Sequence, residues 1–197
     1  MAIEIEAKIK ADDLESLARR LLTLGAKPLR DLRQEDIYFD SPDGRLKKTG
    51  CGLRLRRQTA QKNQNDIIKD KAGAAENSVK AYLTFKGPVG DSVYKSRPET
   101  EVQVSDFQCA LQMLEALGYK RRIAFEKRRR IFGLAGCLVC LDELPVLGRF
   151  VEVEGPDEDA IGRVLKDIGL DGRSHISEGY AKMMAAALRK NRKQKIL

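Results

Sequence analysis

Hydrophobic and charged residues alternate from the third residue of the chain onward. Residues 3–10 read IEIEAKIK, with apolar side chains at the odd positions and charged side chains at the even positions. This two-residue period is typical of a β-strand whose two faces differ in polarity. The same alternation, or an apolar run of strand length, predicts further strands over 36–40, 53–56, 81–86, 95–104, 121–132, 138–144 and 149–154.

Leucine-rich segments between these strands repeat at helical spacing. The first carries Leu14, Leu17 and Leu21, follows a capping residue at Asp12 and ends at Gly25. The same reasoning predicts amphipathic helices over 107–117, after the cap Asp106, over about 159–168, and from near Ser177 into a basic tail.

Each predicted strand has one apolar face and one charged face. The leucine stripes of the helices can be buried only on the outside of a closed barrel, so the apolar faces would point outward and the charged faces inward. We therefore expect an α+β protein, in which a closed antiparallel β-barrel forms a tunnel and amphipathic helices pack outside. An open sheet with one solvated face is the alternative. Residues 126–130, EKRRR, would place charged side chains on both faces of their strand, so they do not distinguish a closed barrel from an open sheet.

A barrel lined by Glu, Arg and Lys would be costly if it were dry and empty. A wet tunnel that holds divalent cations and a polyphosphate removes this cost, because carboxylates bind the metal and basic residues bind phosphate oxygens. The composition agrees: 34% of the 197 residues are charged and the net charge is +8, which favours polyanionic partners.

Several classes of protein are disfavoured. No apolar run approaches the roughly 20 residues that span a bilayer, and no secretory leader precedes the first strand. Cys137 and Cys140 lie three apart in a predicted strand, so we expect free, buried thiols of a cytoplasmic protein rather than a zinc or redox site. His175 is the single histidine, and the chain has no P-loop motif.

An ordered series of motifs resembles the CYTH superfamily, the triphosphate tunnel metalloenzymes, over residues 3 to 185. The GCLVCLDEL stretch from Gly136, followed by Leu147-Gly148, looks most like the class IV adenylate cyclase branch. The segment EGYAK over 178–182 departs from the family, whose members often carry Ser-Tyr before a leucine-rich helix. The matching motifs are EIEAK at 4–8, DIYFD at 36–40, LRLR at 53–56, TFKGP at 84–88, RPETE at 97–101, EKRR at 126–129 and LGRFVEVE at 147–154.

This resemblance implies a role for individual residues and a requirement for Mg²⁺ or Mn²⁺. The implied metal ligands are Glu4, Glu6, Glu152 and Glu154. The implied triphosphate-binding residues are Lys8, Arg54, Arg56, Lys86, Lys127 and Arg129. The remaining tunnel-lining or supporting residues are Tyr38, Glu99, Glu101 and Asp142.

Two reactions fit such a tunnel. A triphosphatase directs water at the terminal phosphorus, whereas a class IV adenylate cyclase directs the ribose 3′-hydroxyl of ATP at the α-phosphorus and expels pyrophosphate. We favour hydrolysis of inorganic or organic triphosphates, because only Tyr38 and Tyr82 are placed to form an adenine pocket. We further expect that removing one tunnel cation would relieve like-charge repulsion in the empty fold.

We expect a single domain over 1–188 and a basic tail over 189–197. Residues 57–80 are polar and lack periodicity, which predicts a mobile lid at one tunnel mouth. A different class of function, a non-catalytic module that binds polyanions or nucleic acid, would use the net charge and the tail, but the inward carboxylates disfavour it. The expected partner is a triphosphate-bearing small molecule, with no membrane; a homodimer stays open.

Overall fold

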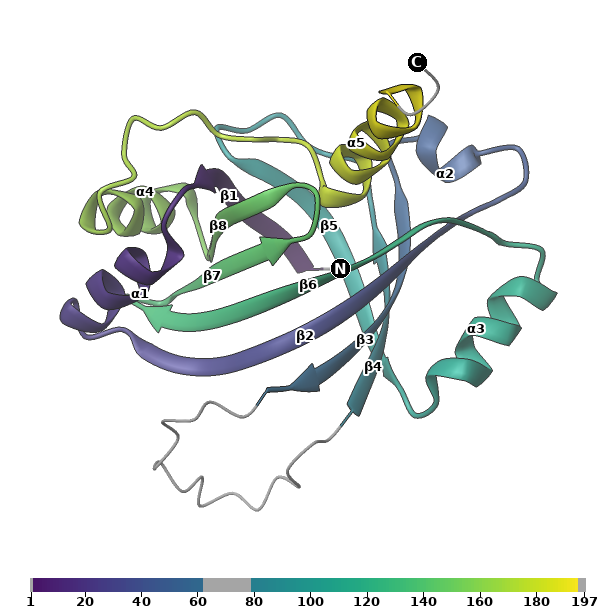
Figure 1. Ribbon diagram of the computed structural model, residues 1–197, viewed down its shortest axis with the longest axis horizontal. Coiled ribbons are helices and arrows are strands. Elements are labelled where there is room, and N and C mark those ends of the chain that lie inside the picture. The colour runs from purple at the N-terminus through teal and green to yellow at the C-terminus, as the bar shows by residue number, and fades with distance from the viewer. Residues whose placement is uncertain (1, 62–78, 195–197) are drawn as a thin grey trace.

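Eight antiparallel strands close into a barrel, as the sequence predicts (Figure 1). Their order around the barrel is β1-β5-β4-β3-β2-β6-β7-β8. The computed structural model describes residues 2–61 and 79–194. The strands are β1 (Ala2–Ala11), β2 (Lys27–Asp40), β3 (Gly52–Ala60), β4 (Val79–Lys86), β5 (Lys95–Val104), β6 (Lys120–Leu134), β7 (Cys137–Leu144) and β8 (Gly148–Gly155). The helices are α1 (Leu14–Thr23), α2 (Arg45–Lys48), α3 (Phe107–Ala116), α4 (Glu158–Asp167) and α5 (Tyr180–Gln194).

Apolar residues of the strands point outward beneath the helices. One cluster joins α1 and α4 to the outer faces of β1, β7 and β8, and includes Leu21, Val151 and Ile161, none of which is exposed to solvent. A second cluster places Phe107 and Leu111 of α3 over Leu55 of β3. The charged faces therefore line most of the barrel interior, and the closed strand order rules out an open sheet.

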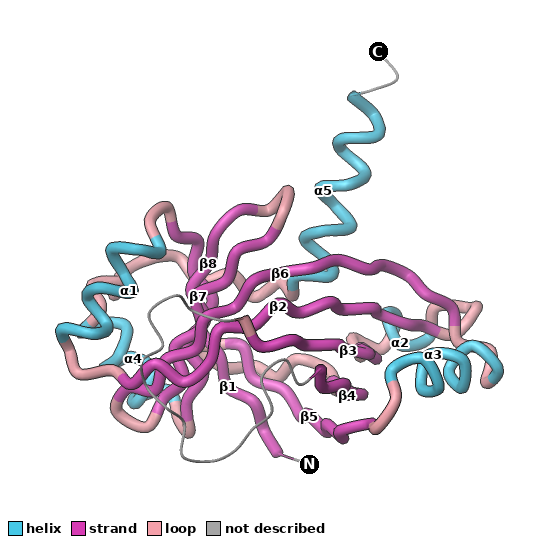
Figure 2. The backbone as a smooth tube through the Cα atoms, turned by 60° about the horizontal axis from the view of Figure 1, so that its bottom comes forward, coloured by secondary structure: helices cyan, strands magenta, loops and turns pink. Residues whose placement is uncertain are grey.

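The fifth helix does not cover the outside of the barrel but meets one of its ends. Tyr180 and Met184 of α5 pack with Phe125, Leu144 and Phe150, which lie on the inward faces of their strands. The rest of α5 projects away from the barrel (Figure 2). The basic segment from Arg189 therefore continues this helix as far as Gln194.

Several boundaries differ from the sequence-based expectation. The strand β2 begins at Lys27 instead of residue 36, because its first half pairs with the end of β6 despite its irregular pattern. The carboxylate of Asp13, not of Asp12, accepts the capping hydrogen bonds of α1, from the backbone N–H groups of Glu15 and Ser16. The short helix α2 has no leucine stripe and was not predicted.

The predicted lid is described only at its edges. The strand β3 continues through residue 60 and β4 begins at residue 79, so both ends of the expected 57–80 loop are strand. Residues 62–78 lie outside the described part of the chain, and the lid stays a prediction.

All four cysteines are free, and Cys137 and Cys140 are buried, as expected for that pair. Cys137 packs in the apolar cluster beneath α4, whereas Cys140 shares the inward face of β7 with Asp142. The three-residue spacing thus separates the two thiols onto opposite faces of the sheet. Among the described residues, no helix is both long enough and apolar enough to cross a membrane.

Candidate active site

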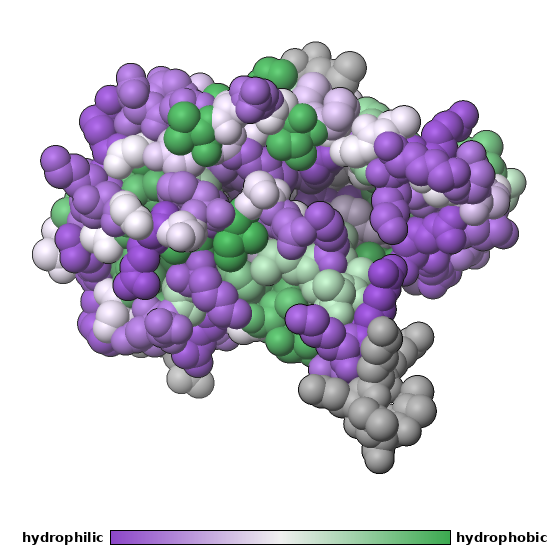
Figure 3. All heavy atoms as spheres, turned by 90° about the horizontal axis from the view of Figure 1, so that it is seen from above, coloured by the Kyte–Doolittle hydropathy of each residue, from purple (hydrophilic) through white to green (hydrophobic). Residues whose placement is uncertain are grey.

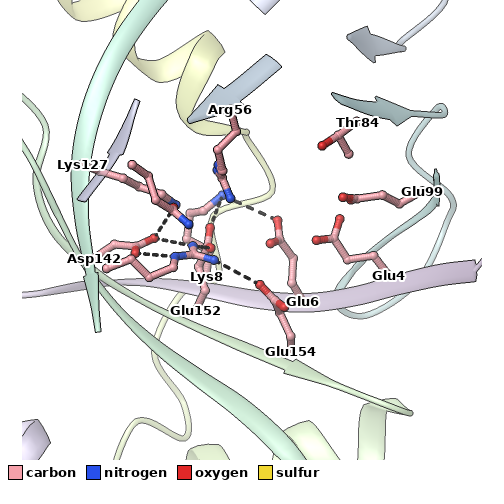
Figure 4. A network of polar contacts seen from close by, with 12 residues as sticks. Glu4, Glu6, Lys8, Arg56, Thr84, Glu99, Lys127, Asp142, Glu152 and Glu154 are labelled. Carbon is pink, nitrogen blue, oxygen red and sulfur yellow. Dashed lines mark hydrogen bonds and ion pairs between the residues drawn. The ribbon is translucent and has the colours of Figure 1, made fainter. Parts of the chain in front are cut away.

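The interior of the barrel is lined by charged side chains of both signs, and each of the eight strands contributes at least one. Figure 4 shows part of this lining. Every site residue predicted from the sequence faces this interior. Glu4, Tyr38, Glu99 and Glu154 are half-buried, and Glu101 lies at an exposed edge. The residues that are less than a tenth exposed are Glu6, Lys8, Arg54, Arg56, Lys86, Lys127, Arg129, Asp142 and Glu152.

Three carboxylates gather where β1 meets β8. The register places Glu6 opposite Glu154, and Glu4 lies one pleat further along the same face of β1. One carboxylate oxygen from each of Glu4, Glu6 and Glu154 lies within 4.8 Å of the others. Burial, together with the neighbouring carboxylates, raises the pKa of Glu154 to about 7, although Arg129 opposes this shift. A cation at this point would relieve the repulsion between the three groups.

This carboxylate triad, Glu4, Glu6 and Glu154, fits a hard divalent cation. All its donors are oxygens, which suits Mg²⁺ or Mn²⁺, and no histidine or thiolate belongs to the group. Glu152, also predicted as a ligand, lies outside the triad. Its carboxylate is 3.1 Å from Lys8 Nζ and also accepts a hydrogen bond from Arg129, and these cations hold its pKa well below the usual value despite burial.

A basic cluster stands beside the triad, on β6. Asp142 is fully buried and receives Arg129 in a two-point contact, with Nε–Oδ1 at 2.7 Å and Nη2–Oδ2 at 2.5 Å. Lys127 Nζ donates to the same carboxylate at 3.0 Å. Burial and then the positive charge of Arg129 lower the pKa of Lys127 to about 8. Asp142 therefore fixes the positions of two cations that point into the interior.

A second basic cluster stands on β3, which is separated from β6 by β2. Arg56 forms a two-point contact with Asp36, at 2.6 and 2.7 Å, and both side chains are buried. This pair holds the pKa of Asp36 far below its usual value, although burial opposes the shift. Arg54 donates to Thr84 at 3.0 Å and to Glu101 at 3.2 Å.

Lys86 links the second basic cluster to the triad. Its ammonium group lies 3.0 Å from Glu4 Oε2 and also donates to Glu99. Each basic side chain is thus held by a carboxylate rather than by another cation. The oxygens of a polyphosphate could replace these carboxylates as hydrogen-bond acceptors, and the basic side chains would not have to move to donate to them.

Among the described interior residues, sequence reasoning gave no site role to Asp36, Thr84, Lys95 or Tyr180. Lys95 begins β5 and donates a hydrogen bond to Glu6; the parity of β5 could have indicated it, because Lys95 shares the face of Arg97 and Glu99. Tyr180 lies in the segment that departs from the family pattern. Its ring centroid is 4.4 Å from Lys8 Nζ and 4.8 Å from Lys127 Nζ, so α5 closes one end of the tunnel over two predicted phosphate ligands.

The raised pKa of Glu154 predicts a pH dependence. In the unfolded chain this glutamate would ionise below pH 5, whereas in the folded, metal-free protein it ionises only near pH 7. Between pH 5 and pH 7 the folded state therefore binds more protons than the unfolded state, and the stability of the metal-free protein should fall as the pH rises. Cation binding requires the ionised form, so affinity for Mn²⁺ should rise about tenfold per pH unit up to pH 7 and then level off. Titration calorimetry at pH 5.5 to 8.5 measures this.

The variant Glu154→Gln separates this effect from general acid lability. This variant should be more stable than the wild type at pH 7.5 without metal. Its affinity for Mn²⁺ should be weaker and should depend much less on pH between pH 5.5 and 7 than that of the wild type. Glu126→Gln, on the outer face of β6, is the matched control and should behave as the wild type. A wild-type affinity that does not vary with pH would contradict the assignment.

Comparisons with known proteins agree with this geometry. Residues 2–180 match the model of the CYTH domain. A Methanocaldococcus jannaschii protein, provisionally named an adenylate cyclase, is 32% identical over 152 residues, which are 77% of this chain and 76% of the relative. The adenylate cyclase CyaB of Aeromonas hydrophila is 29% identical over 151 residues, 76% of this chain and 67% of the relative.

A solved structure extends the likeness to nearly the whole chain. The Hippeastrum protein, provisionally named an adenylyl cyclase and described as having a dominant triphosphatase activity, superposes with a TM-score of 0.63. The match covers 97% of this chain and 96% of that one at 18% identity, which shows a shared fold. With an eight-stranded tunnel, the predicted series of charged residues inside it and a family match over 2–180, the chain belongs to the CYTH domain family.

Proposed function

We propose that the chain is a divalent-metal-dependent enzyme that hydrolyses triphosphates inside its barrel. The observation that carries this proposal is the side-by-side placement of the carboxylate triad and the two basic clusters in one interior. The triad would hold Mg²⁺ or Mn²⁺, which supplies charge neutralisation at the phosphate oxygens. Arg54, Arg56, Lys86, Lys127 and Arg129, with Lys8, would bind the remaining oxygens of the chain of phosphates.

The residues of the barrel act mainly by position. Arg56 and Arg129 are each oriented by a buried aspartate, so their planar donor groups are fixed before the substrate arrives. Water would attack the terminal phosphorus as the bond to the bridging oxygen breaks, which gives orthophosphate and a diphosphate. Such phosphoryl transfer needs alignment and charge stabilisation more than a protein nucleophile.

Cyclisation of ATP to cyclic AMP and pyrophosphate is the second candidate. It is favoured by the names of the two relatives, one named an adenylate cyclase and the other given that name provisionally, and the same charged interior would bind the substrate. A non-catalytic polyanion-binding module is less well supported, because the triad would repel phosphate in the absence of metal.

Chromatography of the products distinguishes these functions. The protein is incubated with inorganic triphosphate, and separately with ATP, in the presence of Mg²⁺ or Mn²⁺. We expect orthophosphate from both substrates, and no turnover when the metal is chelated. Cyclic AMP with pyrophosphate as the main products from ATP would overturn hydrolysis in favour of cyclisation, and binding without any product would favour the non-catalytic module.

A further inference from the structure

A hollow opens into the barrel beside α5, between two connecting segments. One wall is the connection from β4 to β5, around Val93 and Tyr94, and the other is the segment at His175 that precedes α5. Its floor is formed by Glu6, Lys8 and Lys95. Figure 3 looks onto this end of the molecule, where hydrophilic residues cover most of the visible surface.

Both walls of the hollow are fixed to the scaffold. The backbone N–H of Ile176 donates to the carbonyl of Lys8 in β1 at 2.8 Å. The backbone N–H of Val93 donates to the side chain of Glu158 in α4 at 3.0 Å. Because hydrogen bonds to β1 and α4 hold the two walls, the hollow has a defined shape before any ligand enters.

The two walls meet in an aromatic corner. The rings of Tyr94 and His175 lie 5.0 Å apart between centroids, with their planes at 89°. Tyr94 packs against the apolar cluster beneath α4, whereas His175 is exposed. Since the planes are perpendicular, a flat ring that stacks on one of them presents its edge to the other. Val93, 73% exposed beside Tyr94, adds apolar surface that such a ring would cover.

The size and the floor of the hollow identify the ligand. Its volume of about 180 Å³ is below the roughly 300 Å³ at which sites begin to enclose a drug-sized molecule, so it suits one ring system of a larger ligand. Glu6 belongs to the carboxylate triad, and Lys8 and Lys95 are both within ion-pair distance of its carboxylate. If the ring of a ligand fills the hollow, the charged part of the same ligand can therefore extend directly into the proposed metal and phosphate site.

We propose that this hollow, walled by Tyr94 and His175, binds the base of a nucleoside triphosphate whose phosphates lie in the tunnel. The proposal rests on the proposed function, because it needs the triphosphate in the barrel. The base subsite goes beyond the proposed function, because it gives a binding place to the nucleoside part of the substrate, which inorganic triphosphate lacks. Stacking of a base on an aromatic side chain provides the affinity, and the perpendicular second ring limits its orientation.

Equilibrium binding of two matched ligands tests the proposal. The ligands are inorganic triphosphate and ATP, each with both bridging oxygens replaced by methylene groups so that neither hydrolysis nor cyclisation occurs, and Mn²⁺ is present throughout. His175→Ala should raise the Kd of the ATP analogue relative to that of the triphosphate analogue by about tenfold. His175→Phe, which retains a flat ring, should restore the ratio to within about twofold. Arg173→Ala, exposed in the same segment but outside the hollow, is the control and should leave both Kd values unchanged.

Each outcome decides between distinct readings. An equal loss of affinity for both analogues in His175→Ala, or an unchanged ratio, would overturn the subsite and leave the proposed function standing. Wild-type protein that binds the triphosphate analogue but not the ATP analogue would do the same. Wild-type protein that binds neither analogue would overturn the proposed function and the subsite together.

Discussion

Replacing Glu6 with glutamine is expected to reduce the turnover of inorganic triphosphate by about a hundredfold or more and to raise the metal concentration needed for activity. Glu6 is 5% exposed, belongs to the carboxylate triad and is contacted by Lys8 and Lys95. The amide keeps the size of the side chain but removes one of the three charges that a divalent cation would neutralise. Activity measured across a Mn²⁺ titration, with thermal unfolding as a check on folding, gives the result.

A matched control comes from the outer face of the same barrel. Glu35 of β2 also lies in a strand and is paired with Arg57, but it points away from the interior. Glu35→Gln should retain wild-type turnover and metal requirement. If Glu6→Gln were fully active at unchanged metal concentration, the triad would not be the metal site.

Replacing Arg129 with alanine is expected to destabilise the metal-free protein by about 3–5 kcal/mol, because it leaves buried carboxylates without their cation. Arg129 is 7% exposed and contacts Asp142, Glu152 and Glu154. For a protein of this size the loss corresponds to a fall in Tm of roughly 6–20 °C. Binding of inorganic triphosphate should weaken about tenfold or more, since a charge-assisted contact to phosphate is lost. Calorimetric unfolding and a binding titration measure the two effects.

The control for Arg129 is an arginine in an ion pair on the outside. Arg33 of β2 lies 2.6 Å from Glu126, but both side chains are largely exposed, at 65% and 48%. Arg33→Ala should change the stability by about 1 kcal/mol or less. A more stable Arg129→Ala protein would show instead that repulsion between cations dominates the empty tunnel, as the sequence alone led us to expect. The pairing of Arg129 with three carboxylates favours the opposite sign.

The closed barrel could be predicted because its signal is local and repeated. Alternation in 3–10 and 95–104 fixes which side of each strand is apolar, and the leucine stripe of 107–117 needs an apolar surface outside. Strand pairing could not be read in the same way. The first half of β2 has no regular alternation, and only its register with the distant β6 reveals it as strand.

The alternation of residues along the strands predicted which side chains line the site, but not how these side chains divide into a metal site and ion pairs. Parity and the family likeness placed Glu152 and Glu154 on one inward face, yet only the fold separates them. Glu154 joins Glu4 and Glu6, while Glu152 sits between Lys8 and Arg129. The contact between Tyr94 and His175 could not be predicted from the sequence for a different reason. The two residues lie in connections rather than strands, and nothing in their spacing indicates that they meet.

The position of β1 between β5 and β8 imposes an order on the folding of a newly made chain. The strand β1 carries Glu4 and Glu6, but its second edge is paired only once residues 148–155 have left the ribosome. Glu154, the third carboxylate, emerges with them. The long sequence separation of this closing pair predicts slow barrel closure. Acquisition of the metal site should therefore be one of the last events of folding, and metal uptake would report that the barrel has closed.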